Sequence, residues 1–210
     1  MAMPIPFVTE FAADQINQHA ASKYKAPYAS VDPYAIAVER MEGSPLLSGR
    51  PDALHLFPFV YAVEGSDDKY RLTLVFRVES EGWLGRYMYH MPQILTAASL
   101  KNPSPEQLQQ LSAELMTGAT TLRQLMERDA RGELKPTGTK VDIGSLYLVG
   151  SNIGGVVSAG LMHYPDTDLA EEGDDYVIVR SKGDMKANAN AGGLVFGVHY
   201  FHKNQLHTFK

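Results

Sequence analysis

The stretch KYRLTLVFRVES, residues 69–80, carries the clearest structural signal in the chain and decides the predicted fold class. Apolar side chains recur there at every second position: Tyr70, Leu72, Leu74, Phe76 and Val78. The positions between them are polar, with the exception of Val75. Successive side chains of a strand point to opposite faces of its sheet, so this alternation predicts a half-solvated antiparallel strand. We expect it to bury the apolar set and to expose Arg71 and Arg77.

The preceding stretch LHLFPFVYAVE, residues 54–64, is apolar at both alternating sets of positions except for His55. Such a pattern predicts a strand that is covered on both faces. Pro58 cannot donate a hydrogen bond to a neighbouring strand, so it marks a sheet edge or a bulge. The turn residues GSDD, 65–68, join this strand to the next one. Residues 54–79 therefore form a predicted β-hairpin.

A long amphipathic helix is predicted over residues 105–131. Ser104 supplies an N-cap, Pro105 occupies the first helical position and Gln107 completes a capping box. Its apolar stripe consists of Leu108, Leu111, Leu115, Leu122 and Leu125. We expect this stripe to face the core and the helix to end near Gly132, which adopts a left-handed conformation readily.

The other segments have weaker patterns. We predict a short N-terminal helix at 9–24, a short strand at 34–40, and a packed aromatic connection at 82–91 that leads into a short helix at 92–100. Further strands are predicted at 140–149, 153–164, 175–182 and 193–202, with an acidic loop at 165–175 between the second and third of them. Strands, then a helix, then more strands indicate a single α+β domain, residues 1–210, with a mainly antiparallel sheet.

Composition excludes several classes of site. The chain has no cysteine, which rules out disulfides, thiolate zinc sites, iron–sulfur clusters and a cysteine nucleophile. Its net charge is −5 and its Lys and Arg residues are scattered, so a protein partner or self-association is expected before nucleic acid. The uncharged stretch 143–165 contains five glycines, which favours two strands over a membrane span. The N-terminus does not have the pattern of a signal peptide, so we expect a cytoplasmic protein.

An Asn-x-Gly-Gly pattern occurs twice, at 152–155 and at 190–193, and each copy precedes a His-Tyr pair. Asn and Gly accept positive φ angles, so two similar turns, each leading into a strand, explain why the pattern occurs twice. The spacing from Asn to His differs between the copies, which counts against the alternative of a duplicated ligand-binding module.

Histidines are the main candidates for chemistry. The catalytic candidates are His90, His163 and His199, and the candidates for metal ligands are His163, His199 and His202. On one strand His199 and His202 would point to opposite faces, so they could not share a metal unless the strand bulges. The aromatic stretch at 83–92 could line a ligand pocket through Trp83, Arg86, Tyr87, Tyr89 and His90. The sequence assigns no cofactor, and it lacks a Gly-x-Ser-x-Gly elbow, an H-E-x-x-H motif and a nucleotide fingerprint.

Two functions remain open from the sequence. The first is a non-catalytic protein–protein interaction or assembly component, which includes the case of a homo-oligomer. The alternative is a small soluble enzyme, with hydrolysis as the expected reaction, whose histidine-centred site works with or without a divalent metal. The spatial separation of His90, His163 and His199 discriminates between them. In the first case we expect a neutral His199 in the core, bonded to a hydroxyl or to the backbone.

Overall fold

The computed structural model describes residues 28, 30–47, 54–64, 69–80, 83–145, 162–182 and 196–209. The helical elements are α2 (Pro33–Met41), η1 (Pro45–Leu47), α3 (Ala97–Lys101), α4 (Pro105–Ala130) and η3 (Lys203–Gln205). The strands are β1 (His55–Glu64), β2 (Lys69–Ser80), β3 (Trp83–Thr96), β4 (Lys140–Ser145), β5 (Met162–Glu172), β6 (Tyr176–Ser181), β7 (Gly197–His202) and β8 (Leu206–Phe209). The chain therefore combines helices with a sheet, as the α+β prediction requires.

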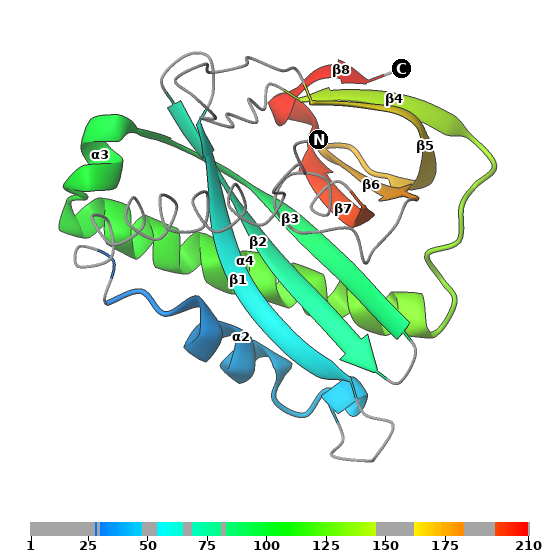
Figure 1. The fold of residues 1–210 in the computed structure, drawn as a ribbon, viewed down its shortest axis with the longest axis horizontal. Coiled ribbons are helices and arrows are strands. Elements are labelled where there is room, and N and C mark those ends of the chain that lie inside the picture. The colour runs from blue at the N-terminus through cyan, green and yellow to red at the C-terminus, as the bar shows by residue number, and fades with distance from the viewer. Residues whose placement is uncertain are drawn as a thin grey trace, which may run out of the picture.

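All described strands belong to one sheet with the order β1-β2-β3-β7-β6-β5-β4-β8. Neighbouring strands are antiparallel except for β3 and β7, which run parallel, so the sheet is mixed. The helix α4 runs across the long strands β1–β3, and β4–β6 curve away from them beside β7 (Figure 1). This parallel pair joins the N-terminal hairpin strands to the C-terminal ones, and it is the seam on which the candidate site lies.

The predicted hairpin is confirmed, because β1 and β2 pair antiparallel from His55 opposite Glu79 onwards. Leu72, Leu74 and Phe76 are buried, as their alternation predicts. Arg77 is exposed whereas Arg71 is half-buried. The half-solvated character of β2 is wrong at its centre, where Thr73 and Val75 are fully buried on the other face. Side chains pack on both faces of the sheet at this point, so a polar residue such as Thr73 can be buried when it has a hydrogen-bond partner.

The strand β1 lies at the edge of the described sheet, which agrees with the position of Pro58 in it. Its predicted cover on both faces is wrong, because His55 and Phe57 are exposed. The Arg77 guanidinium lies 5.9 Å from the centre of the Phe57 ring and gives this ring a partial cover. An edge strand has a neighbour on one side only, and so its side chains are screened from water less completely.

The long helix is confirmed, with both halves of its capping box in place. The Gln107 amide nitrogen donates to the Ser104 hydroxyl at 3.2 Å, and the Ser104 amide nitrogen donates to the Gln107 side chain at 2.9 Å. The helix ends at Ala130, two residues before Gly132, whose φ is +73°. Its buried residues are Leu111, Leu115, Gly118, Ala119, Leu122, Leu125 and Met126. Among the described residues, no helix is long and apolar enough to cross a membrane.

Two weaker predictions are wrong. Residues 34–40 form part of the helix α2, because the Asp32 carboxylate caps the amides of Tyr34 and Ala35, and Pro33 takes the first helical position. The helix expected at 92–100 is confined to α3, since β3 continues as far as Thr96. Pro92 is exposed within β3, a position where the strand does not need its nitrogen as a donor.

The acidic loop expected at 165–175 is also wrong over most of its length, because β5 extends to Glu172. Asp168 is buried there and lies 2.8 Å from the Lys140 ammonium and 2.7 Å from that of Lys182. The ammonium groups of Lys140 and Lys182 thus compensate the charge of Asp168, which the sequence predicted to lie in a loop. The predicted helix 9–24, the turn 65–68 and both Asn-x-Gly-Gly turns lie outside the described residues.

The sheet carries a separate core on each face. The helix-covered face holds the larger core, in which α2 and α4 pack on even-numbered residues of β2 and odd-numbered residues of β3. The opposite face holds a smaller core near β7: Val141, Ile143, Leu169, Val177, Val179 and Phe201. Val198 belongs to the first core and Phe201 to the second, so the described part of β7 is covered on both faces.

Candidate functional site

The register of β2, β3 and β7 brings three candidate side chains to one face of the sheet. Thr73 stands directly opposite His90 in the β2–β3 pair, and Met88 stands opposite His199 in the parallel β3–β7 pair. Met88 and His90 are two residues apart on β3, so they share a face. His199 therefore lies diagonally across from His90 on the smaller-core face.

The next strand adds a fourth side chain. Val179 on β6 stands opposite His199, and Ser181 stands opposite Gly197. Ser181 is two residues from Val179 and so shares its face. Four neighbouring strands thus each contribute one polar side chain to a continuous row, which we call the histidine chain: Thr73, His90, His199 and Ser181.

Hydrogen-bond distances connect all four members of the histidine chain. The Thr73 hydroxyl lies 3.1 Å from Nδ1 of His90, and Nε2 of His90 lies 3.1 Å from Nδ1 of His199. Nε2 of His199 lies 3.2 Å from the Ser181 hydroxyl. Both nitrogens of each imidazole are therefore engaged, and a hydroxyl stands at each end of the row.

The two imidazoles are interior groups, with His90 1% exposed and His199 0% exposed. The Phe201 ring stacks on His90 with 4.0 Å between ring centres and 5° between ring planes. Burial, followed by the neighbouring His199 and His202, lowers the pKa of His90 well below its usual value. His90 is consequently neutral at neutral pH, with one ring nitrogen that donates and one that accepts.

When both imidazoles are neutral, the hydrogen bonds along such a row can run in either of two directions. When Ser181 donates to Nε2 of His199, Nδ1 of His199 donates to His90, and His90 in turn donates to Thr73. In the reverse direction Thr73 donates, and His199 offers its proton to the Ser181 oxygen. Only the first direction places a proton acceptor against the Ser181 hydroxyl, as a nucleophile with its general base requires. The geometry permits this direction because every heavy-atom distance is within hydrogen-bond range.

A pocket of about 290 Å³ lies where β3 and β7 begin and β6 ends, and Ser181 is among the residues that line it. Strands β3, β6 and β7 and the end of α4 supply its lining: Trp83, Leu84, Gly85, Arg86, Tyr87, Asp129, Arg180, Ser181, Lys182, Gly197 and Val198. We call it the β3–β6 pocket. Its volume is at the lower end of the roughly 300–1,000 Å³ typical of small-molecule sites, so it suits a small ligand.

Cations outnumber anions around the β3–β6 pocket. Arg86, Arg180 and Lys182 line it together with a single carboxylate, that of Asp129. The Arg180 guanidinium pairs with Asp129 and also donates to the carbonyl oxygen of Leu134 at 2.8 Å. Arg86 is buried, and that burial, with the charge of Arg77 opposite it, lowers its pKa. Lys182 in turn pairs with Asp168 at 2.7 Å, so carboxylates already compensate two of these three cations.

Two glycines shape the pocket walls. Gly197 has φ +141°, and a Cβ there would lie 2.5 Å from the carbonyl oxygen of Arg86, so only glycine lets β7 approach β3 this closely. At Gly85 a Cβ would lie 2.4 Å from the Trp83 indole. The indole therefore folds over the backbone at the pocket rim.

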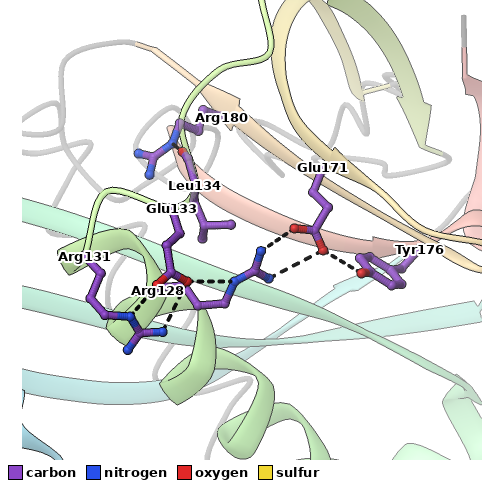
Figure 2. Close-up of polar contacts among 7 residues, drawn as sticks. All are labelled: Arg128, Arg131, Glu133, Leu134, Glu171, Tyr176 and Arg180. Atoms are coloured by element: carbon purple, nitrogen blue, oxygen red, sulfur yellow. Dashed lines mark hydrogen bonds and ion pairs between the residues drawn. The ribbon is translucent and has the colours of Figure 1, made fainter.

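A second set of polar contacts lies on the helix-covered face, near the C-terminal end of α4. The Glu171 carboxylate pairs with Arg128 and accepts the Tyr176 hydroxyl at 2.6 Å (Figure 2). Figure 2 also shows Arg131 and Arg128 converging on Glu133 just beyond the end of α4. These contacts fasten the C-terminal end of α4 to β5 and β6, and so hold the pocket wall in place.

The structure brings only some of the sequence candidates together. His90 and His199 meet, whereas the side chain of His163 lies outside the described residues. His202 points to the opposite face from His199, as expected, and its Nε2 lies 3.0 Å from the Tyr89 hydroxyl. In the described part of the chain, no group of three or more His, Asp or Glu side chains is placed to hold a metal ion.

Of the predicted ligand-binding residues, Trp83, Arg86 and Tyr87 line the β3–β6 pocket, whereas Tyr89 and His90 lie further along β3 and do not. Sequence reading missed Thr73 and Ser181, because each is an ordinary strand residue without a motif. Asp129 and Arg180 were missed as well, because they lie 51 residues apart and no local pattern links them.

A separate apolar surface lies at the other end of the helix-covered layer. A groove of about 970 Å³ runs between α2 and β1, which we call the α2–β1 groove. Its lining is Tyr34, Val38, Glu39, Met41, Glu42, Gly43, Ser44, Pro45, Leu47, Leu54, His55, Leu56 and Pro58. Among these lining residues, Tyr34 is 60% exposed and Val38 52% exposed.

No protein-family model, curated protein or solved structure matches this chain.

Proposed function

We propose that the protein is a non-catalytic interaction component that holds a segment of a partner protein in the α2–β1 groove. The single observation that carries this proposal is the exposure of Tyr34 and Val38, two large apolar side chains that line one groove. Large apolar side chains cost free energy in water, about 25 cal/mol for each Å² that a partner could cover. A contiguous set of them beside a groove is typical of a protein–protein contact.

The charges at the groove select the partner. Glu39 and Glu42 are the two carboxylates of its described lining, so its rim is acidic. A partner segment with an apolar anchor and flanking Lys or Arg residues complements this rim. A second copy of the chain complements it less well, because a two-fold contact at this groove would bring Glu39 and Glu42 of both copies together.

The mode of binding follows from Pro58. A partner strand added to the open edge of β1 would need the donors along that edge, and Pro58 has no N–H to give. We therefore expect side chains of the partner to occupy the groove without extension of the sheet.

The test uses the full chain and three fluorescent peptides with the same apolar anchors, flanked by Lys/Arg, by Asp/Glu or by Ser. Fluorescence anisotropy should rank the basic peptide first. Val38→Glu should weaken its binding by at least about tenfold, as expected for a central contact. The matched control is Ile94→Glu, which changes an equally exposed apolar residue on β3 outside the groove.

Equal binding of the acidic peptide, or unchanged binding by Val38→Glu, would contradict the proposal. Sedimentation of the unliganded chain tests whether a second copy of the chain occupies the groove. If the chain forms a dimer that dissociates in Val38→Glu and persists in Ile94→Glu, the groove binds a second copy of the chain and not another protein. A monomer in all three forms supports the partner protein.

A small hydrolytic enzyme is the second candidate function, and one observation favours it. A ring nitrogen of His90 and one of His199, two of the three catalytic candidates, lie 3.1 Å apart in the histidine chain. General-base catalysis needs a neutral imidazole within reach of a hydroxyl or a water molecule. Hydrolysis of activated esters that disappears in His199→Gln, with circular dichroism unchanged, would support this candidate. A wild-type rate no higher than that of buffer would contradict it.

A further inference from the structure

We propose that the β3–β6 pocket binds a single neutral pyranose ring, with the Trp83 indole as the stacking platform and the Arg180–Asp129 pair as the hydrogen-bonding group. The ligand is a free sugar or the terminal residue of a glycan, because both present the same ring. The site is separate from the α2–β1 groove and from the histidine chain, and it does not depend on either candidate function above.

The indole and the charged pair lie on the same face of the sheet. Tyr87 packs in the helix-covered core, and strand residues alternate between faces, so Gly85 and Trp83 belong to this face as well. The indole lies over Gly85, where a Cβ would come within 2.4 Å of it. Arg180 reaches the same face, since it pairs with Asp129 of α4, the helix that covers this face. The side chains of the proposed site therefore converge from β3, β6 and α4.

Trp83 provides an aromatic face that is open to a ligand. It lines the pocket and is 44% exposed, although part of its ring lies over the backbone of β3. An exposed indole gains free energy when an apolar surface covers it, and the C–H groups on one side of a pyranose ring form such a surface. Among the described lining residues the other aromatic ring, that of Tyr87, is 5% exposed, so a planar base could not be enclosed between two rings.

Arg180 has hydrogen-bond donors left for a ligand. A guanidinium carries five N–H groups, and in Arg180 Nε donates to the Leu134 carbonyl oxygen at 2.8 Å while Nη2 donates to Asp129. Among the contacts of the described residues, the two N–H groups of Nη1 and one of Nη2 have no protein partner. The two existing contacts hold the guanidinium in place, so its remaining donors are oriented before a ligand binds.

Asp129 supplies the matching acceptors. Its Oδ1 accepts from Arg180 and its Oδ2 accepts from the Tyr87 hydroxyl at 2.7 Å, whereas a carboxylate offers about four acceptor positions. A sugar hydroxyl both donates and accepts a hydrogen bond. Neighbouring hydroxyls of one ring can therefore contact a guanidinium that only donates and a carboxylate that only accepts.

The charge balance of the pocket favours a neutral ligand. The charges of Arg180 and Asp129 cancel, and Lys182 pairs with Asp168 at 2.7 Å. Arg86 is buried and, as an even-numbered residue of β3, it points away from the helix-covered face. The volume of about 290 Å³ is small for a ligand site, which favours one sugar ring over a chain of several.

Tryptophan fluorescence is the first measurement, because Trp83 is the single tryptophan of the chain. The probes are D-glucose, D-galactose, D-mannose and N-acetyl-D-glucosamine, each as the free sugar and as its methyl glycosides. At least one of them should give a saturable change in emission, and the sugars should differ in affinity because the Arg180–Asp129 pair is fixed. Glycerol, which has hydroxyls but no ring face, should give no saturable change. The absence of a saturable response to every sugar would overturn the proposal.

A variant of Arg180 tests the hydrogen-bonding group in the same assay. Arg180→Gln should weaken binding of the responding sugar at least about tenfold, as expected when hydrogen bonds from a charged donor are lost. The matched control is Arg131→Gln, which removes an exposed guanidinium that pairs with Glu133 outside the pocket lining and should leave the affinity unchanged. Equal affinities of Arg180→Gln and the wild type would overturn the assigned site.

Variants of Trp83 keep the proposal testable if Arg180→Gln does not fold, because Trp83 is an exposed residue. Saturation-transfer NMR observes the signals of the sugar and so does not need the tryptophan. Trp83→Ala should weaken binding at least about tenfold, and Trp83→Phe, which keeps an aromatic face, should weaken it less. Tyr34→Ala removes an exposed ring from the α2–β1 groove and should bind as the wild type does. Undiminished binding by Trp83→Ala would overturn the stacking platform.

Guanosine and inorganic phosphate test the ligand class. Tighter binding of guanosine than of every sugar, or displacement of the sugar by phosphate, would overturn a neutral pyranose as the ligand. The methyl glycosides distinguish the two sources of the ring. Binding of a methyl glycoside as well as its free sugar supports the terminal residue of a glycan, and binding of the free sugar alone supports a monosaccharide.

Discussion

The Tyr87 hydroxyl on β3 donates a 2.7 Å hydrogen bond to the Asp129 carboxylate at the end of α4. Burial, followed by this contact, raises the pKa of Tyr87, so the hydroxyl keeps its proton at all ordinary pH values. Asp129 also pairs with Arg180 on β6. One carboxylate therefore ties the long helix to two strands and fixes the width of the β3–β6 pocket.

Tyr87→Phe tests this tie. The substitution removes the hydroxyl and leaves the ring in the core, so the change reports the hydrogen bond to a charged acceptor, about 1.5–3 kcal/mol of unfolding free energy. Urea denaturation measures it. Tyr34→Phe is the control, because Tyr34 is exposed on α2, and its stability should equal that of the wild type. Equal stability of Tyr87→Phe and wild type would show that Asp129 is held by Arg180 alone.

Gly118→Ala should destabilise the chain although alanine is the better helix former. A Cβ at Gly118 would lie 2.7 Å from Cδ1 of Tyr89, whose ring packs against α4. Overpacking costs about 1–3 kcal/mol, whereas the helix propensity gains at most about 1 kcal/mol. Thermal unfolding shows whether Gly118→Ala stabilises or destabilises the chain. Combining Gly118→Ala with Tyr89→Leu should recover part of the loss, and an equal loss in the double variant would contradict the steric cause.

Leu74→Ala should lower the free energy of unfolding by about 2–5 kcal/mol, as for other buried leucines. Leu74 is 1% exposed on the helix-covered face of β2. Val38→Ala is the comparison, because Val38 is an exposed aliphatic residue and should change stability by less than about 0.5 kcal/mol. Similar losses in the two variants would place Leu74 outside the core.

The buried imidazole of His90 predicts a pH dependence of stability. Its pKa is lowered in the folded chain relative to the usual value of 6.5, so the unfolded chain binds more protons just below that value. Stability should be fully present above about pH 6.5 and fall as the pH decreases, by at most about 1.4 kcal/mol per pH unit for each such group.

Urea titrations between pH 7.5 and 5.0 measure this slope. His202, whose pKa is also lowered, contributes in the same direction. His90→Gln should flatten the slope, and His202→Gln should flatten it less, because His202 is only half-buried. The carboxylates with lowered pKa values, such as Glu171, respond at lower pH, below their usual value of 4.5. A slope that is unchanged in His90→Gln would show that His90 is not the source.

Local patterns in the sequence determined the β1–β2 hairpin and the limits of α4. These features depend on neighbours within a few residues: the period of apolar positions, a Ser104–Gln107 capping box and a Gly at the helix end. The same local logic failed at α2, where the Asp32–Pro33 cap was overlooked, and at β5, where acidic residues resembled a loop. Asp168 is acceptable in a strand because lysines from elsewhere in the sheet neutralise it.

Only the tertiary structure decided the candidate site. His90 and His199 are 109 residues apart, and they meet because β7 inserts beside β3 in parallel. No alternation or capping signal specifies which strands become neighbours, since pairing depends on the packing of the whole sheet. That pairing made Thr73 a buried partner of His90, and it placed the Ser181 hydroxyl beside the imidazole of His199.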